Sequence, residues 1–186
     1  DPQQQGPAGD LKPRDRQQPG DHQGKDHAQQ HGRTGTEADA IAMRLARAFR
    51  RRSKILKFEG GYHGMSDYAL MSLSPARPGN SERPIPDSAG IPDAVRNEMI
   101  VAPFNDLAAA QQLIHAYRDE LAGVIVEPMQ RLLPPVPGFL QGLRDITAEH
   151  GIALIFDEVV TGFRLAYGGA QAYYCVTPDL CTLGKV

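Results

Sequence analysis

Three stretches of the sequence carry side chains that could do chemistry together. Thr34-Gly35-Thr36, followed by Glu37, opens a segment with helical periodicity. The start of a helix offers unpaired N–H groups and a positive dipole end, and glycine permits close approach, so a phosphate could bind there. Asp157 follows the apolar strand expected at 153–156, at the kind of strand end where open α/β sheets bind ligands. Lys185 follows another short strand, and an ε-amine becomes a nucleophile when burial and neighbouring charge lower its pKa.

Taken singly, each of these signals has an ordinary structural explanation. A threonine followed by a glutamate is common helix capping. Asp157 could be a capping or metal-binding acid, although a carboxylate buried at a strand end needs a charged partner. Lys185 alone carries little information, because lysine is common. Two nearby residues are expected to be structural: His63 as a hydrogen-bonding side chain, although it could also assist near a ligand, and Glu158, which points away from Asp157 and receives no catalytic role.

From residue 34 onward, predicted strands alternate with predicted amphipathic helices. The strands are expected at 54–58, 99–101, 124–126 and 152–156, and the later helices at 106–118 and 139–150. Continuous apolar strands joined by amphipathic helices predict an α/β fold whose mostly parallel sheet is covered by helices on both faces. The first helix should bury one apolar face and end in arginines that suit the negative end of its dipole. That face is Ala38, Ile41, Ala42, Leu45, Ala48 and Phe49, and the arginines are Arg50, Arg51 and Arg52.

Length and composition exclude several classes of protein. The 186 residues suffice for one domain, and the net charge of -2 gives no electrostatic reason to expect a nucleic-acid or anionic membrane surface. No apolar run approaches the ~20 residues that span a bilayer, and no secretory pattern opens the chain, so a cytoplasmic protein is expected. Cys175 and Cys181 form no C-x-x-C motif.

Residues 1–33 hold few apolar side chains and irregularly spaced histidines, which predicts a disordered tail without a metal site. Residues 74–93 are rich in proline and glycine and should be irregular.

The order and setting of these stretches resemble the class III pyridoxal-phosphate-dependent aminotransferases, which have fold type I. The resemblance covers about residues 34–186. Three further segments carry it: KFEGGYHG at 57–64, LAGVIVEP at 121–128 and IFDEVVTGFR at 155–164. Within the family, residues 165–171 and the Val-Thr-Pro-Asp-Leu that follows are most similar to the glutamate-1-semialdehyde 2,1-aminomutases.

The resemblance implies that pyridoxal 5'-phosphate is the cofactor and assigns it a set of binding residues. Gly35 and Thr36 would hold its phosphate, while Tyr62 and Val159 would pack on opposite faces of its ring. Asp157 would keep the pyridine nitrogen protonated, so that the ring can act as an electron sink. Lys185 would form the Schiff base through which the amino group is transferred. Asp157 and Lys185 are therefore the expected catalytic residues, and no metal is expected.

The resemblance also implies a small amino-acid, amino-aldehyde or keto substrate, and a homodimer with active sites near the subunit interface. Differences from the family pattern leave transaminase and aminomutase activity both open. Thr34 replaces the usual serine, and the Gly-Asn that typically follows the Glu-Pro segment in aminomutases is missing after Glu127-Pro128. The apolar strand expected before Thr34 is also missing, so residues 1–33 are interpreted as a disordered tail or the product of an upstream frameshift. Residues 34–186 are interpreted as a partial cofactor-binding large domain, and the chain on its own is expected to be inactive.

Two other interpretations compete with amino transfer. An apolar strand that ends in Asp157-Glu158 also resembles the acidic strand end of P-loop ATPases, but the G-x-x-x-x-G-K-[ST] motif that a P-loop needs does not occur. The second alternative is an inactive fragment or a non-catalytic module of the same family. A reading frame that continues beyond Lys185 into the rest of such an enzyme would favour a fragment of an enzyme.

Overall fold

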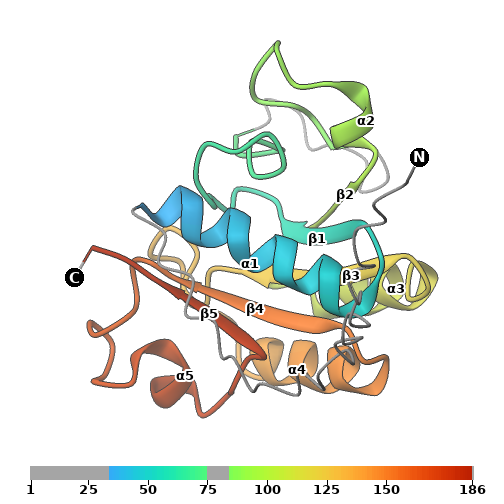
Figure 1. Cartoon of the computed structure of the whole chain (residues 1–186). Helices are drawn as coiled ribbons and strands as arrows, with labels where there is room; N and C mark the ends of the chain where they lie inside the picture. The colour runs from blue at the N-terminus through green and yellow to red at the C-terminus, as the bar shows by residue number, and fades with distance from the viewer. Residues whose placement is uncertain (1–33, 75–83, 186) are drawn as a thin grey trace, which may run out of the picture.

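The computed structural model describes residues 34–74 and 84–185, and these contain a five-stranded parallel sheet with helices on both faces (Figure 1). The strands lie in the order β2-β1-β3-β4-β5, and every neighbouring pair is parallel. The predicted α/β fold class is confirmed. The strands are β1 (Lys54–Phe58), β2 (Met99–Ala102), β3 (Leu121–Val126), β4 (Ala153–Glu158) and β5 (Leu180–Leu183). The helices are α1 (Gly35–Arg50), α2 (Asp93–Arg96), α3 (Leu107–Ala116), α4 (Phe139–Glu149) and α5 (Gly169–Tyr174).

The element boundaries follow the sequence prediction closely, with small extensions. β1 coincides with the strand expected at 54–58, while β3 begins three residues earlier than expected and β4 continues to Glu158. The tail at 1–33 lies outside the described residues, as do residues 75–83 of the segment expected to be irregular. Among the described residues, no helix is long and apolar enough to cross a membrane.

The strands place their side chains alternately in two cores, one on each face of the sheet. Ile155 of β4 points into the core beneath α1, whereas Leu154 and Phe156 point into the core beneath α3 and α4. Figure 1 shows α1 crossing one face of the sheet, with α4 and α3 on the other side. Because successive side chains of a strand point to opposite faces, the last two residues of β4 separate. Asp157 faces α1, and Glu158 faces away from it.

The face of α1 that packs on the sheet differs from the one predicted. The buried residues are Asp39, Ala42, Met43 and Ala46, whereas Leu45 is 40% and Phe49 82% exposed. Both sets have the same i, i+3, i+4, i+7 spacing, so periodicity alone does not choose between them. The sheet chooses: a Cβ added at Gly123 of β3 would lie 3.1 Å from the Ala46 Cβ. This close approach requires a small side chain at position 46 to face the sheet, and it leaves Leu45 and Phe49 at the side of the sheet.

The end of α1 is tied to the start of β3 and to the residues before β4 by Arg50, one of the three arginines expected at this helix terminus. The Arg50 guanidinium donates to the carbonyl oxygens of Arg118, Leu121, His150 and Gly151, at 2.6–2.7 Å. Four acceptors from two separate segments of the chain, 118–121 and 150–151, thus converge on one side chain. Arg50 therefore fixes the position of α1 along the sheet, and with it the position of the helix start at the opposite end.

A buried lysine holds the loop after β1 in place. Lys57 is fully buried, and its Nζ donates to the carbonyl oxygens of Gly61 at 2.9 Å, Ala69 at 2.9 Å and Met71 at 2.6 Å. Three acceptors match the three N–H groups of an ammonium. Burial lowers the pKa of Lys57 from 10.5 to about 8, so the side chain is still charged at neutral pH. The loop at 60–71 therefore depends on one buried positive charge.

Replacing Lys57 by methionine should destabilise the fold, because three buried carbonyl groups each lose a hydrogen-bond donor. We expect the free energy of unfolding to fall by roughly 3 kcal/mol at neutral pH. Above pH 8 the folded protein has released the Lys57 proton while the unfolded chain still binds it, so the stability contributed by Lys57 rises until pH 10.5. Denaturant unfolding across this range should show the gap between wild type and Lys57→Met widening as the pH rises.

Lys54→Met provides the matched control, because Lys54 lies on the same strand but its side chain is partly exposed and pairs with Glu120 at 3.4 Å. Its effect on stability should be smaller and should not grow between pH 8 and 10.5. A constant gap between wild type and Lys57→Met over this range would show that Lys57 does not titrate there.

Candidate active site

One cavity, of about 280 Å³, lies beyond the carboxyl ends of the strands and brings all six predicted site residues together. Open parallel sheets bind ligands at this edge, because the loops that follow the strands converge there. The residues come from α1, from the loop after β1, and from the ends of β3, β4 and β5. They are Gly35, Thr36, Asp39, Tyr62, Gly64, Glu127, Asp157, Val159, Val160 and Lys185.

The start of α1 forms one wall of the cavity. Thr34 is the N-cap, and its hydroxyl accepts a hydrogen bond from the Glu37 N–H at 3.2 Å, so ordinary capping accounts for this pair. The Thr36 hydroxyl accepts from the Met65 N–H at 3.2 Å. Gly64, with a φ of +87°, permits this contact, because a Cβ there would lie 2.6 Å from the Thr36 Cα. The loop after β1 therefore packs directly on the helix start that is expected to hold a phosphate.

Asp157 is buried in the cavity wall and accepts hydrogen bonds on both oxygens. Its Oδ2 accepts from Nδ1 of His63 at 2.8 Å, and its Oδ1 accepts from the Val159 N–H at 3.1 Å. Two donors aimed at one carboxyl favour its ionised form. His63 is 1% exposed and hydrogen-bonded, as predicted, and its partner is the aspartate that the sequence singled out.

A second buried carboxyl, Asp39, was missed by the sequence analysis. Asp39 is 2% exposed, and its Oδ1 accepts the Thr182 hydroxyl at 2.6 Å. Side-chain atoms of Asp39, His63 and Asp157 lie within 4.8 Å of one another. Burial, and then the charge of Asp157, raise the pKa of Asp39 from 3.8 to about 8. The available signal was an acid in register with Ala42 and the other small residues of α1, the face that the prediction did not choose.

Tyr62 and Val159 line the cavity from two different elements. Val159 is 9% exposed and lies close to Gly35 and Gly184, since a Cβ added at either glycine would come 3.2 Å from its Cγ1. Tyr62 is 44% exposed, and its backbone N–H donates to Oε1 of Glu127 at 2.6 Å. Glu127 belongs to the Glu-Pro segment but was not predicted as a site residue. It fixes the backbone of the loop that presents Tyr62.

Lys185 reaches the cavity from the end of β5. Its backbone carbonyl accepts from Nη2 of Arg164 at 2.9 Å, and its φ of 55° lies in the left-handed region. Its side chain is exposed to solvent. Arg164, which follows β4, therefore fixes the backbone of a lysine that lines the cavity.

Glu158 has a structural part on the other side of the sheet. It is fully buried and accepts from the Thr161 hydroxyl at 3.0 Å, the Gln171 N–H at 3.2 Å and the Ala170 N–H. These bonds hold the start of α5 against the end of β4. The prediction that Glu158 points away from Asp157 is confirmed.

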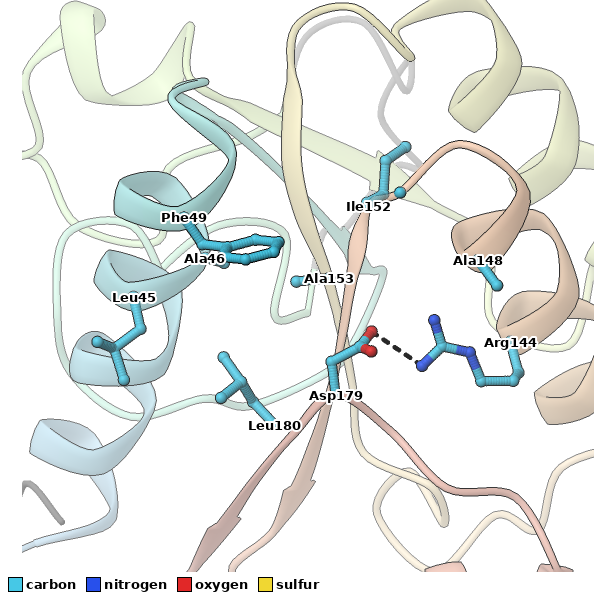
Figure 2. A pocket seen from close by; sticks show the side chains of 10 residues that line it. Leu45, Ala46, Phe49, Arg144, Ala148, Ile152, Ala153, Asp179 and Leu180 are labelled. Atoms are coloured by element: carbon cyan, nitrogen blue, oxygen red, sulfur yellow. Dashed lines mark hydrogen bonds and ion pairs between the residues drawn. The ribbon is translucent and has the colours of Figure 1, made fainter. Parts of the chain in front are cut away.

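A larger cavity, of about 540 Å³, lies at the opposite ends of the strands and lacks this chemistry. Figure 2 shows Leu45 and Phe49 of α1 on one side, Leu180 between, and the ion pair of Arg144 with Asp179, at 2.8 Å, on the other. Its lining is mainly apolar, and its two charged residues pair with each other. The predicted site residues all line the smaller cavity.

Comparison with known proteins identifies the family. The family model for "Aminotransferase class-III" matches residues 20–186. Glutamate-1-semialdehyde 2,1-aminomutase 2 of Brevibacillus brevis is 51% identical over 156 residues, which are 82% of this chain and 36% of that protein. An omega-transaminase structure from Sphaerobacter thermophilus has a TM-score of 0.77 and 46% identity, over 82% of this chain and 36% of that one. A transaminase structure with PLP bound has a TM-score of 0.72 and 30% identity, over 82% and 35%.

The chain thus spans about a third of the length of these relatives. These relatives are two transaminases and an aminomutase, all of them enzymes. None of the three is a P-loop ATPase. The match to the family model covers most of the chain and includes every residue of the cavity. The resemblance found in the sequence is confirmed: the chain belongs to the class III aminotransferases.

Proposed function

We propose that this chain carries the pyridoxal-phosphate-binding part of an enzyme that transfers amino groups, with Lys185 as the Schiff-base residue. The supporting observation is the single cavity that holds a helix start, a buried carboxylate and a lysine. These are the partners needed by a phosphate, a cationic ring nitrogen and an aldehyde. Two of the similar proteins are transaminases, one of them solved with PLP bound, and a third is an aminomutase.

The residues around the cavity fit this cofactor. The first N–H groups of α1 have no partner within the helix, and Gly35 and Thr36 place that helix start in the cavity wall, where it favours a phosphate. Gly64 could not be replaced by a larger residue without displacing Thr36, so the loop and the helix form a close-fitting corner. When bound, the cofactor would supply an aldehyde and an electron-withdrawing ring, and the protein would supply orientation and charge.

Each cavity residue then has a distinct task in the proposal. Tyr62 and Val159 would contact the two faces of the ring and keep water from them. Asp157, ionised and held by two donors, would keep a proton on the ring nitrogen. Lys185 would attack the aldehyde through its unprotonated amine and would later accept and return the substrate α-proton.

The reaction class is proposed as transamination or 2,1-aminomutation of a small amino-acid, amino-aldehyde or keto substrate, in a homodimer. The similar proteins include both kinds of enzyme, and they are about three times longer than this chain. Tyr62 and the side chain of Lys185 are exposed, so the cavity is open on the side where a substrate must be enclosed. We therefore propose that the chain by itself binds cofactor without catalysing transfer.

Borohydride reduction after incubation with pyridoxal phosphate tests the Schiff-base assignment. Reduction fixes the cofactor on the lysine that binds it, and peptide mass mapping should find the label on Lys185. Lys185→Arg keeps the positive charge but cannot form the Schiff base, so its labelling should fall to background. Lys54→Arg is the control and should be labelled at Lys185 like the wild type. Preferential labelling of any other lysine would reject the assignment, and robust amino transfer by this chain alone would reject the proposed inactivity.

Asp157→Asn tests the partner of the ring nitrogen. The substitution preserves size and removes the negative charge, so the ring nitrogen of the bound cofactor should be unprotonated at neutral pH. We expect an affinity roughly 10- to 100-fold lower, because a charge-assisted hydrogen bond is lost while the phosphate contacts remain. The nitrogen-15 chemical shift of ring-labelled cofactor measures the protonation directly. A ring nitrogen that stays protonated in Asp157→Asn would contradict the assignment, and the exposed Asp145→Asn controls for removing one carboxylate.

A further inference from the structure

The carboxyl of Asp39 lies against Asp157 inside the candidate active site, and the tasks proposed above leave it unused. Both side chains are at least 95% buried, at 2% and 5% exposure, and both line the cavity. A carboxylate oxygen of Asp39 and one of Asp157 lie within 4.8 Å of each other. Two buried negative charges at this distance repel each other strongly, so the pair should hold one proton at neutral pH. The question is which carboxyl carries it.

The hydrogen bonds around the pair place the charge on Asp157. Asp157 accepts from the His63 ring and from the Val159 amide, so both of its oxygens have donors. Asp39 accepts one hydrogen bond, from Thr182 at the end of β5. A carboxyl with fewer donors, in an equally buried position, is the one that keeps its proton.

The other charged groups near the cavity act in the same direction or too weakly to reverse it. Glu127, at the end of β3, adds a further negative charge that raises the pKa of Asp39. Lys185 lines the same cavity, but its side chain is exposed to solvent, where its charge is screened. Burial has the largest effect on Asp39, followed by the charge of Asp157, and together they raise its pKa to about 8.

We propose that Asp39 is a positioning residue: it is carried as a neutral carboxylic acid, donates its O–H to Asp157, and so makes Asp157 the single ionised carboxylate of the pair. The pair then presents one negative charge to the cavity, located on the oxygen atoms that His63 and Val159 hold in place. When Asp39 loses its proton to solvent at higher pH, the pair presents two. No bond to a ligand is made by Asp39 itself.

The ligand chemistry that suits this arrangement is a protonated nitrogen heterocycle. The Asp157 carboxylate, held in one position, stabilises a cationic ring nitrogen. Neutral Asp39 holds Asp157 in place through its O–H, and because Asp39 keeps the shared proton, Asp157 stays ionised. This step rests on the proposed function, because it takes the cofactor ring as the occupant. The protonation of Asp39 does not, because it follows from the protein alone.

The protonation is tested on the chain without cofactor, by carbon-13 NMR of labelled aspartate carboxyls. In the wild type one carboxyl should titrate with a midpoint near pH 8, and this signal should vanish in Asp39→Asn and persist in the exposed Asp145→Asn. Thr182→Val should move the midpoint upward, because the hydroxyl bond favours the ionised form of Asp39. An Asp39 carboxyl that titrates in the ordinary range of aspartate, near pH 4, would overturn the inference.

The folding equilibrium gives a second measurement on the same variants. The folded pKa of Asp39 lies above its unfolded value, so the stability it contributes is present below pH 4 and is lost as the pH rises to 8. Asparagine cannot titrate, so Asp39→Asn should gain stability relative to wild type over this range. Equal pH dependence in the two proteins would also overturn the inference.

The positioning effect is tested with ring-labelled pyridoxal phosphate. The amide introduced by Asp39→Asn is uncharged and keeps an N–H donor for Asp157, so this variant should bind like wild type at pH 7 with the ring nitrogen protonated. Asp39→Ala has no donor and should bind several-fold more weakly. The nitrogen-15 signal should change near pH 8 in wild type and stay constant in both variants.

A change near pH 8 that persists in Asp39→Asn would overturn the positioning role. If no variant binds the cofactor, the proposed function fails, and the carboxyl titration still decides the protonation of Asp39.

Discussion

The candidate site depends on keeping one carboxylate charged inside the protein. Asp157 is 95% buried, and a charge in that position is costly unless donors replace the water that it has lost. One donor is distant in the sequence, His63 from the loop after β1, and the other is local, the Val159 amide from the turn after β4. The neighbouring acid, Asp39, comes from α1. Three separate elements must therefore meet at the end of β4 before the site exists.

The rest of the fold can be understood as the means of holding those elements together. Lys57 gathers three carbonyls of the loop that carries His63, and Gly64 brings that loop against Thr36. Arg50 fixes the far end of α1. On the other side of the sheet, Glu158 holds the start of α5 against the end of β4 by accepting backbone hydrogen bonds from Ala170 and Gln171. The alternation of side chains along β4 explains how adjacent acids, Asp157 and Glu158, serve the cavity and the scaffold respectively.

The sequence predicted the local elements well, because strand runs, helix caps and short motifs are written in neighbouring residues. It also singled out six of the ten residues that line the cavity, through the order of the motifs and the family resemblance. It did not predict Asp39 or Lys57 as buried groups. A charged residue in a helix or strand is usually exposed, and only the packing of α1 on Gly123 and of the loop on β1 reveals that these two are inside. Periodicity offered two faces of α1, and contacts far away in the sequence chose between them.

The two residues that escaped prediction also show how the site affects stability. Burial shifts both pKa values toward about 8, from above for Lys57 and from below for Asp39. Above pH 4 the unfolded chain releases the Asp39 proton while the folded protein retains it, which costs stability. Below pH 10.5 the unfolded chain binds the Lys57 proton more tightly than the folded protein does, which also costs stability. The stability lost through Asp39 accumulates up to pH 8, and the stability recovered through Lys57 begins there, so these two groups together weaken the fold most near pH 8. A core selected for stability alone would contain neither Lys57 nor Asp39. A cavity that orients the charged Asp157 carboxylate uses both: Lys57 holds the loop that carries His63, and Asp39 keeps the proton beside Asp157.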